Sequence, residues 1–374
     1  MWMIWVGFTV FILGMLALDL GVFHRRSHVI RVREALIWSA IWISIALAFT
    51  VFVWFGYEHH WLGLGMTIDP VDGQINDGKS ATLKYLTAYV LEKSLSVDNL
   101  FVIAMIFGFL AVPAVYQHRV LFWGIIGALV LRGAMIAVGS QLVARYNWIL
   151  YVFGAFLVIT AIKMLIIKGH DDPTQNVVVR LAKRFLPVTD RFHGQHFLVR
   201  AGSTAASEAA VAGMPLQVDA AVERARPGQL MITPLFLALI LVETTDVVFA
   251  VDSIPAVFAI TGDPFLVYTS NVFAIMGLRS LYFALAGMLN RFRYLKVSLA
   301  IVLAIVGLKM LLHNQLKEAL GSAFNLYLLV VIVVVLAAGV IGSLFSDPVV
   351  MPGPDAEDPK NPEKPASQDG EPPR

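Results

Sequence analysis

The sequence contains no cysteine in 374 residues, and only 14% of its residues are charged. Without cysteine the chain has no disulfide bonds and no thiolate metal sites. Soluble domains carry about 25% charged residues, so this low charge, with a hydrophobic content of 58% and a mean hydropathy of +0.75, predicts a membrane protein. The first apolar run also lacks a basic leader and an A-x-A cleavage motif, and we expect it to be retained rather than removed as a signal peptide.

Apolar runs of roughly 20 residues alternate with polar segments, and a helix of that length crosses about 30 Å of hydrocarbon. The sequence therefore predicts an all-α integral membrane protein with about nine transmembrane helices, surrounded by the lipid bilayer and without a nucleic-acid partner. The predicted spans are residues 1–22, 34–56, 82–110, 119–141, 147–167, 231–260, 266–289, 295–313 and 324–345.

The charges between the spans predict the topology. Basic segments follow the first, third, fifth and seventh spans, whereas "EHHWLGLGMTIDPVDGQINDGKS" after the second span is acidic in balance. The positive-inside rule then places the N-terminus outside and the C-terminus in the cytoplasm. We expect a transmembrane transporter domain over residues 1–345, a cytoplasmic loop with a flexible Ala-rich linker at 168–230, and a disordered cytoplasmic tail at 346–374.

Two parts of the chain, 82–167 and 231–313, repeat one pattern of charges. "SVDNLFVIAMI" at 96–106 aligns with "AVDSIPAVFAI" at 250–260. Each copy contains three spans, and the loop between the copies returns the chain to the same side, so we predict two inverted three-helix repeats of the kind found in secondary transporters. The matched charges are Glu92 with Asp246, Asp98 with Asp252, Arg132 with Arg279, and Lys163 with Lys309.

Acidic residues near the middle of a span are costly, on the order of 2.5–3.5 kcal/mol each. Only two arginines, Arg132 and Arg279, lie at comparable depth, so bound protons or a bound cation must balance the remaining negative charge. The alternative is that the charged groups form internal salt bridges that hold the bundle together. The acids concerned are Glu92, Asp98, Glu243, Asp246 and Asp252.

Three further charged residues lie near the ends of spans. Asp19 precedes two arginines and can form a local ion pair with them. Lys163 and Lys309 can extend to the lipid headgroups or can support the intramembrane acids.

The candidate ligands for a cation are all oxygen atoms. Asn99 and Ser253 each follow one of the repeated aspartates. Pro255 is expected to break its helix and to free backbone carbonyls beside Asp252. With no thiolate and no histidine in the middle of a span, such a site suits Mn²⁺, Ca²⁺ or Mg²⁺ as a substrate. No tightly bound cofactor is expected.

Several long stretches together resemble one known family. They are "ALDLGVFHR" (17–25), "EKSLSVDNLFV" (92–102), "PVTDRFHG" (187–194) and "TPLFLALILVETTDVVFAVDSIPA" (233–256). The chain is similar in these stretches to the TerC/Alx family of bacterial integral membrane proteins. That resemblance implies a protein of the bacterial cytoplasmic (inner) membrane and a role in metal homeostasis, with Mn²⁺ export and tellurite resistance as the associated functions. By motif it implicates Glu92, Asp98, Asn99, Glu243, Asp246, Asp252 and Ser253, and also Asp19.

These observations favour a secondary transporter, not an enzyme, that exports Mn²⁺ from the cytoplasm in exchange for protons. Glu92, Asp98, Asp246 and Asp252 would form the metal cage, and Arg132 and Arg279 would stabilise the cage when it is empty. Calcium transport is an open alternative. Another is a membrane scaffold that recruits soluble stress proteins through the 168–230 loop. An intramembrane aspartyl protease is disfavoured, because no span contains a G-x-G-D motif.

Overall fold

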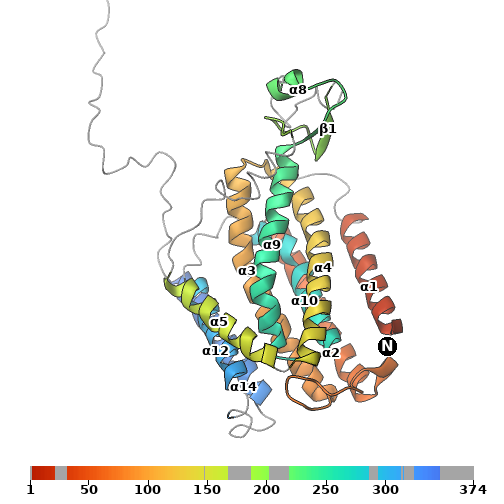
Figure 1. Ribbon diagram of the computed structural model, residues 1–374, viewed down its shortest axis with the longest axis vertical. Helices are drawn as coiled ribbons and strands as arrows, with labels where there is room; N and C mark the ends of the chain where they lie inside the picture. The colour runs from red at the N-terminus through yellow and green to blue at the C-terminus, as the bar shows by residue number, and fades with distance from the viewer. Residues whose placement is uncertain are drawn as a thin grey trace, which may run out of the picture.

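The protein is mainly helical, as the computed structural model in Figure 1 shows. The structure describes residues 2–21, 32–146, 148–166, 187–201, 219–285, 294–312, 315 and 324–345. Its helices are α1 (Trp2–Gly21), α2 (Val32–Glu58), the 3₁₀ turn η1 (Trp61–Gly63), α3 (Gly78–Phe109), α4 (Ala114–Arg145), α5 (Trp148–Ile166), α8 (Ala220–Arg224), α9 (Pro234–Phe258), α10 (Pro264–Met276), α11 (Leu278–Leu285), α12 (Leu295–Leu311) and α14 (Phe324–Leu344). Strands β1 (Leu198–Arg200) and β2 (Leu230–Ile232) form one antiparallel pair.

Side-chain caps fix where the central helices begin. Asp77 accepts a hydrogen bond from the Ser80 N–H at 2.7 Å and starts α3. Thr233 caps α9 and Asp263 caps α10, and each cap is followed by a proline at the first helical position. Proline there loses no hydrogen bond, because the first N–H groups of a helix have no intrahelical partner.

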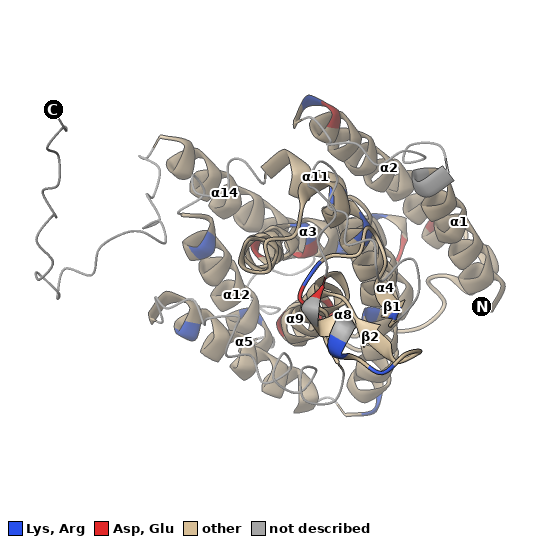
Figure 2. Cartoon of the chain, turned by 90° about the horizontal axis from the view of Figure 1, so that it is seen from above, with Lys and Arg blue, Asp and Glu red and all other residues tan. Residues whose placement is uncertain are grey.

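The helices form a bundle with α3, α9, α4 and α10 at its centre. In the view from above, α1 and α2 lie on one flank and α5, α12 and α14 on the other (Figure 2). The first flank is attached largely by aromatic contacts, such as the edge-to-face pair of Phe8 and Phe265, whose ring centroids are 5.8 Å apart. Through these contacts α1 packs on α10.

The second flank depends on two glycines that let α5 and α12 approach closely. A Cβ on Gly307 would lie 2.8 Å from the carbonyl oxygen of Gly154, and a Cβ on Gly154 would lie 3.0 Å from the carbonyl oxygen of Gly307. Any larger residue at either position would push the two backbones apart. Close crossings of this kind are common between membrane helices.

A described helix lies at each predicted span, but two expectations about helix breaks are wrong. Pro255 does not break α9, which continues through it to Phe258. The proline is in the last turn of the helix, where it removes a single N–H and leaves little helix beyond it to kink. The span predicted at 266–289 is instead divided, because α10 ends at Met276 and α11 begins at Leu278. Gly277 lies between them.

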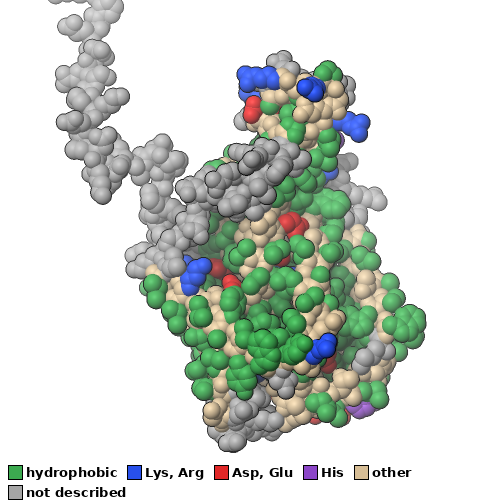
Figure 3. Space-filling model, viewed as in Figure 1, with side chains coloured by type: hydrophobic (Ala, Val, Ile, Leu, Met, Phe, Trp, Pro, Cys, Tyr) green, Lys and Arg blue, Asp and Glu red, His purple; other side chains and the backbone are tan. Residues whose placement is uncertain are grey.

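Five described helices are long and apolar enough to cross a membrane by length and composition: α2, α4, α5, α9 and residues 325–344 of α14. Hydrophobic side chains cover the body of the molecule in the space-filling view, as expected for a surface that faces lipid (Figure 3). The chain is therefore a multi-pass membrane protein. The count of nine crossings stays a prediction.

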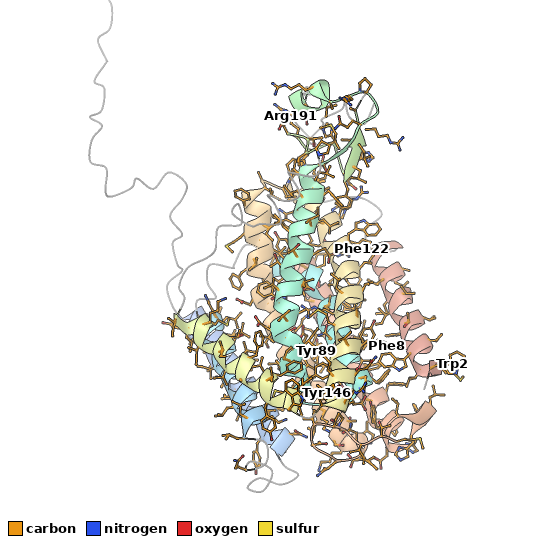
Figure 4. All side chains as sticks on the ribbon, viewed as in Figure 1. Trp2, Phe8, Tyr89, Phe122, Tyr146 and Arg191 are labelled. Carbon is orange, nitrogen blue, oxygen red and sulfur yellow. The ribbon has the colours of Figure 1, made fainter. Side chains whose placement is uncertain are left out.

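A small cap lies at one end of the bundle and consists of residues 187–201 and 219–233. Asp219 holds it together: its carboxylate accepts hydrogen bonds from the Arg191 N–H at 3.0 Å and the Ala221 N–H at 2.9 Å, and it contacts His193 Nε2 at 3.1 Å. Figure 4 labels Arg191 in this cap, at the opposite end of the molecule from Trp2. The rest of the predicted loop, including the Ala-rich linker, and the predicted tail from 346 lie outside the described residues.

Candidate functional site

Arg132 of α4 is buried at the centre of the bundle and contacts two acids from different helices. Its guanidinium binds Asp246 of α9 with two hydrogen bonds, Nε to Oδ2 at 3.0 Å and Nη2 to Oδ1 at 2.8 Å. Its Nη1 forms an ion pair with Glu92 of α3. Glu92 and Asp246 are the two acids that the sequence pattern matches between the repeats. One cation thus faces two carboxylates, which leaves this cluster with a formal charge of −1.

Two neutral side chains complete the surroundings of Arg132. Nη1 also lies 3.4 Å from Ser253 Oγ of α9 and 3.4 Å from Asn271 Oδ1 of α10. The Ser253 hydroxyl donates in turn to Glu92 Oε1 at 3.3 Å. Within the described part of the chain, the buried Oε2 of Glu92 has no hydrogen-bond partner. Buried polar atoms are nearly always paired, so this oxygen is a position where a proton or a cation can bind.

Glu243 lies one turn before Asp246 on the same face of α9. Its carboxylate fills the space beside Gly127 of α4, where an added Cβ would overlap it. Glu243 Oε2 is buried and has no hydrogen-bond partner among the described residues. Glu243 is therefore a second carboxylate with a free acceptor close to the Arg132 cluster.

The close approach of Gly127 and Glu243 predicts the effect of a small substitution. Gly127→Ala forces the carboxylate or α4 to move, and we expect the free energy of unfolding to fall by about 1–3 kcal/mol. The midpoint of thermal unfolding in detergent measures this loss. Gly108→Ala on α3 is the matched control, because no atom of the described residues lies within 4 Å of the added Cβ. Equal midpoints for the two variants would contradict the close contact.

Asp252 lies apart from this cluster, on the side of α9 that faces α5. Its carboxylate accepts a hydrogen bond from Thr160 Oγ1 at 3.2 Å. Lys163, one turn further along α5, is exposed but lies close enough to act on the Asp252 carboxylate electrostatically. Asp246 and Asp252 are six residues apart, so the two carboxylates point about 120° away from one another around the helix.

The remaining predicted site residues are distributed along the bundle. Asp98 is partly buried and Asn99 is buried, both on α3 one turn or more beyond Glu92. Arg279 is buried at the start of α11. Asp19 belongs to α1, but its side chain lies outside the described residues. Across the described ranges, no group of three or more His, Cys, Asp or Glu side chains is placed to hold a metal ion. The structure thus brings Glu92 and Asp246 together around Arg132, and the predicted four-carboxylate cage is not assembled in this conformation.

A second buried polar cluster lies at the end of the bundle opposite the cap. The Lys84 ammonium of α3 contacts three oxygens: Asp69 Oδ2 at 2.8 Å, Asp72 Oδ2 at 2.6 Å and Asn76 Oδ1 at 2.6 Å. Lys309 does not extend to the headgroups as its position near a span end suggested. It is buried and donates to the Ala259 carbonyl at 2.6 Å.

Asp69 links this cluster to the turn between α9 and α10. It accepts hydrogen bonds from Thr261 Oγ1 at 2.5 Å and from the Gly262 N–H at 2.8 Å. Burial alone would raise the pKa of Asp69, but the Lys84 ammonium and the hydrogen bonds to the carboxylate together hold the pKa below its usual value. The loop after α2 is therefore tied to both predicted repeats.

Several of these residues were not predicted from the sequence. Lys84 and Lys93 both lie within a predicted span, and a charged residue there is the signal that could have identified them. Their positive charges lower the excess of negative charge expected inside the membrane. Thr160 and Asn271 carry no comparable signal, because a hydroxyl or an amide in an apolar run is also consistent with packing alone.

Comparison with known proteins gives consistent relationships. Residues 77–349 match the family model described as "Integral membrane protein TerC family". An "Uncharacterized membrane protein STKORF319" from Myxococcus xanthus is 43% identical over 96% of this chain and 96% of its own length. The "Putative membrane-bound redox modulator Alx" of Escherichia coli K12 is 40% identical over 88% of this chain and 94% of its own length. No solved structure matches the chain.

The matched segment covers well over half of the chain and contains α3, α4, α9 and α10, the helices that hold the Arg132 cluster. It also contains the motif around Glu92 that suggested the relationship. The chain therefore belongs to the integral membrane protein TerC family.

Proposed function

We propose that this protein is a secondary transporter that exports a divalent metal ion across the bacterial cytoplasmic membrane in exchange for protons, with Mn²⁺ as the proposed ion. Its N-terminus would lie outside and its cap in the cytoplasm. The protein would carry out no chemical conversion and hold no resident cofactor, because the metal ion is its cargo.

The observation that carries the proposal is the Arg132 cluster. A buried charge is stable in a membrane only when it is paired, and this cluster pairs one arginine with two carboxylates, of which Glu92 still has an unpaired oxygen. Glu243 adds a further carboxylate oxygen nearby that has no hydrogen-bond partner in the part of the chain that the structure describes. A buried group of carboxylates with too few cations is suited to bind a divalent ion when Arg132 moves aside, or protons when it does not.

The helix contacts are consistent with inverted repeats. The second helix of the first copy, α4, packs on α9, and the second helix of the other copy, α10, packs on α3. The third helices, α5 and α12, pack on one another. A two-fold relation between the copies requires this reciprocal pattern. It would place Glu92 and Asp246 at the junction, where transporters of this architecture bind their substrates.

The side chains around the cluster favour a hard ion. The available donors are carboxylates, the Ser253 hydroxyl and the Asn271 amide oxygen, which suit Mn²⁺, Ca²⁺ and Mg²⁺. Asp98 and Asp252 lie on the same two helices and would join the ion after a change in helix packing. Calcium therefore remains the competing substrate.

Substitutions that keep the shape of the acids test the proposal. In proteoliposomes loaded with a metal-sensitive dye, we expect Glu92→Gln and Asp246→Asn each to lower Mn²⁺ uptake at least about tenfold. Each substitution removes a ligand charge and leaves the other carboxylate fully neutralised by Arg132, so no excess negative charge remains in the cluster to bind the ion. Asp98→Ala and Asp252→Ala test the other predicted ligands in the same assay. Glu58→Gln is the control, since Glu58 lies at the end of α2 beside Gly78, outside the cluster.

Adding a pH gradient to the same vesicles tests proton exchange, and replacing Mn²⁺ by Ca²⁺ tests selectivity. Wild-type vesicles that take up no divalent ion under any of these conditions would refute the proposed function. Unchanged uptake in both the Glu92 and Asp246 variants would refute the site.

The names of the Escherichia coli relative and its counterparts point to redox modulation. This chain contains no cysteine, so it cannot itself exchange disulfides. An influence on redox state is still compatible with the proposal, because the export of a redox-active metal changes the chemistry of the compartment that loses it.

A further inference from the structure

The break between α10 and α11 lies inside the predicted seventh span. Gly277 leaves the helical path there, with φ −87° and ψ 7°, and its N–H donates to the Ile275 carbonyl. The last carbonyls of a helix have no intrahelical donor and carry the negative end of the helix dipole. Within a membrane such an end needs a positive or hydrogen-bonding partner from elsewhere in the protein.

That partner is Lys93 of α3. Its ammonium donates to the Ala274 carbonyl in the last turn of α10, at 3.1 Å. Gly277 makes room for this contact, because a Cβ there would lie 2.9 Å from Lys93 Nζ and 3.1 Å from Trp42 Cβ. Lys93 belongs to neither the Arg132 cluster nor the Lys84 cluster, so neither cluster explains its position at the helix break.

The break and the Arg132 cluster share two helices. On α3, Glu92 reaches Arg132 while the next residue, Lys93, points about 100° away and reaches the break. On α10, Asn271 contacts Arg132, and Ala274, nearly one turn later, receives Lys93. A change in the Lys93 contact therefore shifts the same two helices that hold the central acids.

We propose that the Lys93 ammonium is a built-in monovalent cation at the carbonyl end of α10, and that it makes transport by this protein independent of sodium. In secondary transporters the C-terminal ends of broken helices coordinate the coupling Na⁺. Here a side chain of the protein supplies the same charge to the same kind of helix end. The consequence for transport rests on the proposed function, whereas the binding of a cation in place of Lys93 does not.

The first test measures cation binding without transport. The full-length protein is purified in detergent, and its thermal unfolding is followed in choline, Na⁺, K⁺ and methylammonium chlorides at equal ionic strength. Wild type should unfold at one temperature in all four salts. Lys93→Ala should unfold earlier in choline, and methylammonium or a small alkali cation should raise its midpoint by about 3 °C or more. Lys79→Ala, an exposed lysine at the start of the same helix, should behave as wild type.

Two further variants keep the test decisive if Lys93→Ala does not fold. Lys93→Gln retains an N–H donor without the charge and should show the same response to small cations. Lys93→Arg retains the charge and should show none. A Lys93→Gln protein with the same midpoint in all four salts, or a wild-type protein stabilised specifically by Na⁺, would overturn the inference.

Uptake of Mn²⁺ by proteoliposomes then tests the consequence for transport. Wild type should be equally active in Na⁺ and in choline. Lys93→Ala should lose at least about tenfold in choline and recover at least about threefold in Na⁺ or methylammonium. If wild type moves no divalent ion, the proposed function fails while the unfolding data still decide the role of Lys93. Sodium-dependent uptake by wild type would show that Lys93 does not replace a coupling ion.

Discussion

Replacing Arg132 by methionine is expected to cost about 3–5 kcal/mol of folding free energy, because it removes one partner of a buried ion-pair cluster. Methionine fills much of the same space but leaves Glu92 and Asp246 facing one another without a cation. Glu92 is fully buried, so its charge cannot be solvated in place. The loss should appear as a much lower midpoint of thermal unfolding and a poor yield of folded protein in detergent.

Removing the acids together with the arginine separates this effect from lost packing. In the triple variant Arg132→Met, Glu92→Gln, Asp246→Asn none of the three charges of the Arg132 cluster remains, and most of the stability should return. Arg145→Met, at the exposed end of the same helix, should change stability by no more than about 0.5 kcal/mol. An Arg132→Met protein as stable as wild type would mean that Glu92 and Asp246 are both protonated when the arginine is absent and need no cation.

The second large effect is expected for Lys84→Met, again about 3–5 kcal/mol. The substitution leaves the Asp69 carboxylate and the Asn76 amide oxygen buried without their common donor. Because the loop after α2 is held to α3 through this ammonium, the loss should also make residues 59–77 more sensitive to a protease added to the purified protein. Lys79→Met, exposed and on the same helix, provides the comparison.

The contribution of Asp69 to the free energy of unfolding should change with pH in the opposite direction in Lys84→Met. In wild type the pKa of Asp69 is lowered, so its stabilising contribution is present above the ordinary pKa of 3.8 and is lost as pH falls through the lowered value. Without Lys84, burial is expected to raise the pKa of Asp69, and its contribution would be lost as pH rises from 3.8 through the raised value. The deficit in the free energy of unfolding of Lys84→Met relative to wild type should therefore grow as pH rises, both below and above 3.8. Lys84→Met combined with Asp69→Asn has no carboxylate at this position, so its deficit relative to wild type should stay constant above pH 3.8.

The helices, and the pairing of Arg132 with acids inside the membrane, were predictable from the sequence because both follow from the cost of polar groups in hydrocarbon. Because of that cost, spans are apolar and most charged residues lie between them. A buried arginine such as Arg132 must form ion pairs with carboxylates. The cost does not say which acids, because two of the candidate acids lie on α3 and three lie on α9, and they face different neighbours. The rotation of each helix selects Glu92 and Asp246, and packing against α4 decides that rotation.

The position of the helix break was not predictable in the same way. Proline has a strong local effect, but near the end of α9 that effect is small. Glycine has a weak local effect, yet Gly277 is where the chain leaves the helical path, because Lys93 and Trp42 occupy the space that a side chain would need. Such a break depends on residues far away in the sequence. The Lys84 cluster was not predicted for a related reason. The loop after α2 has the residue types of ordinary surface turns, yet its Asp69, Asp72 and Asn76 side chains contact the Lys84 ammonium.

The glycine crossing of α5 and α12 has a mechanical consequence. If the two repeats rock against one another during transport, the point of closest backbone contact between them moves least. Gly154 and Gly307 mark that point, so the crossing would serve as a fulcrum. A bulkier residue at either position would increase the distance between α5 and α12. The protein would then lose the exchange between its transport conformations while the side chains that bind the ion stayed in place.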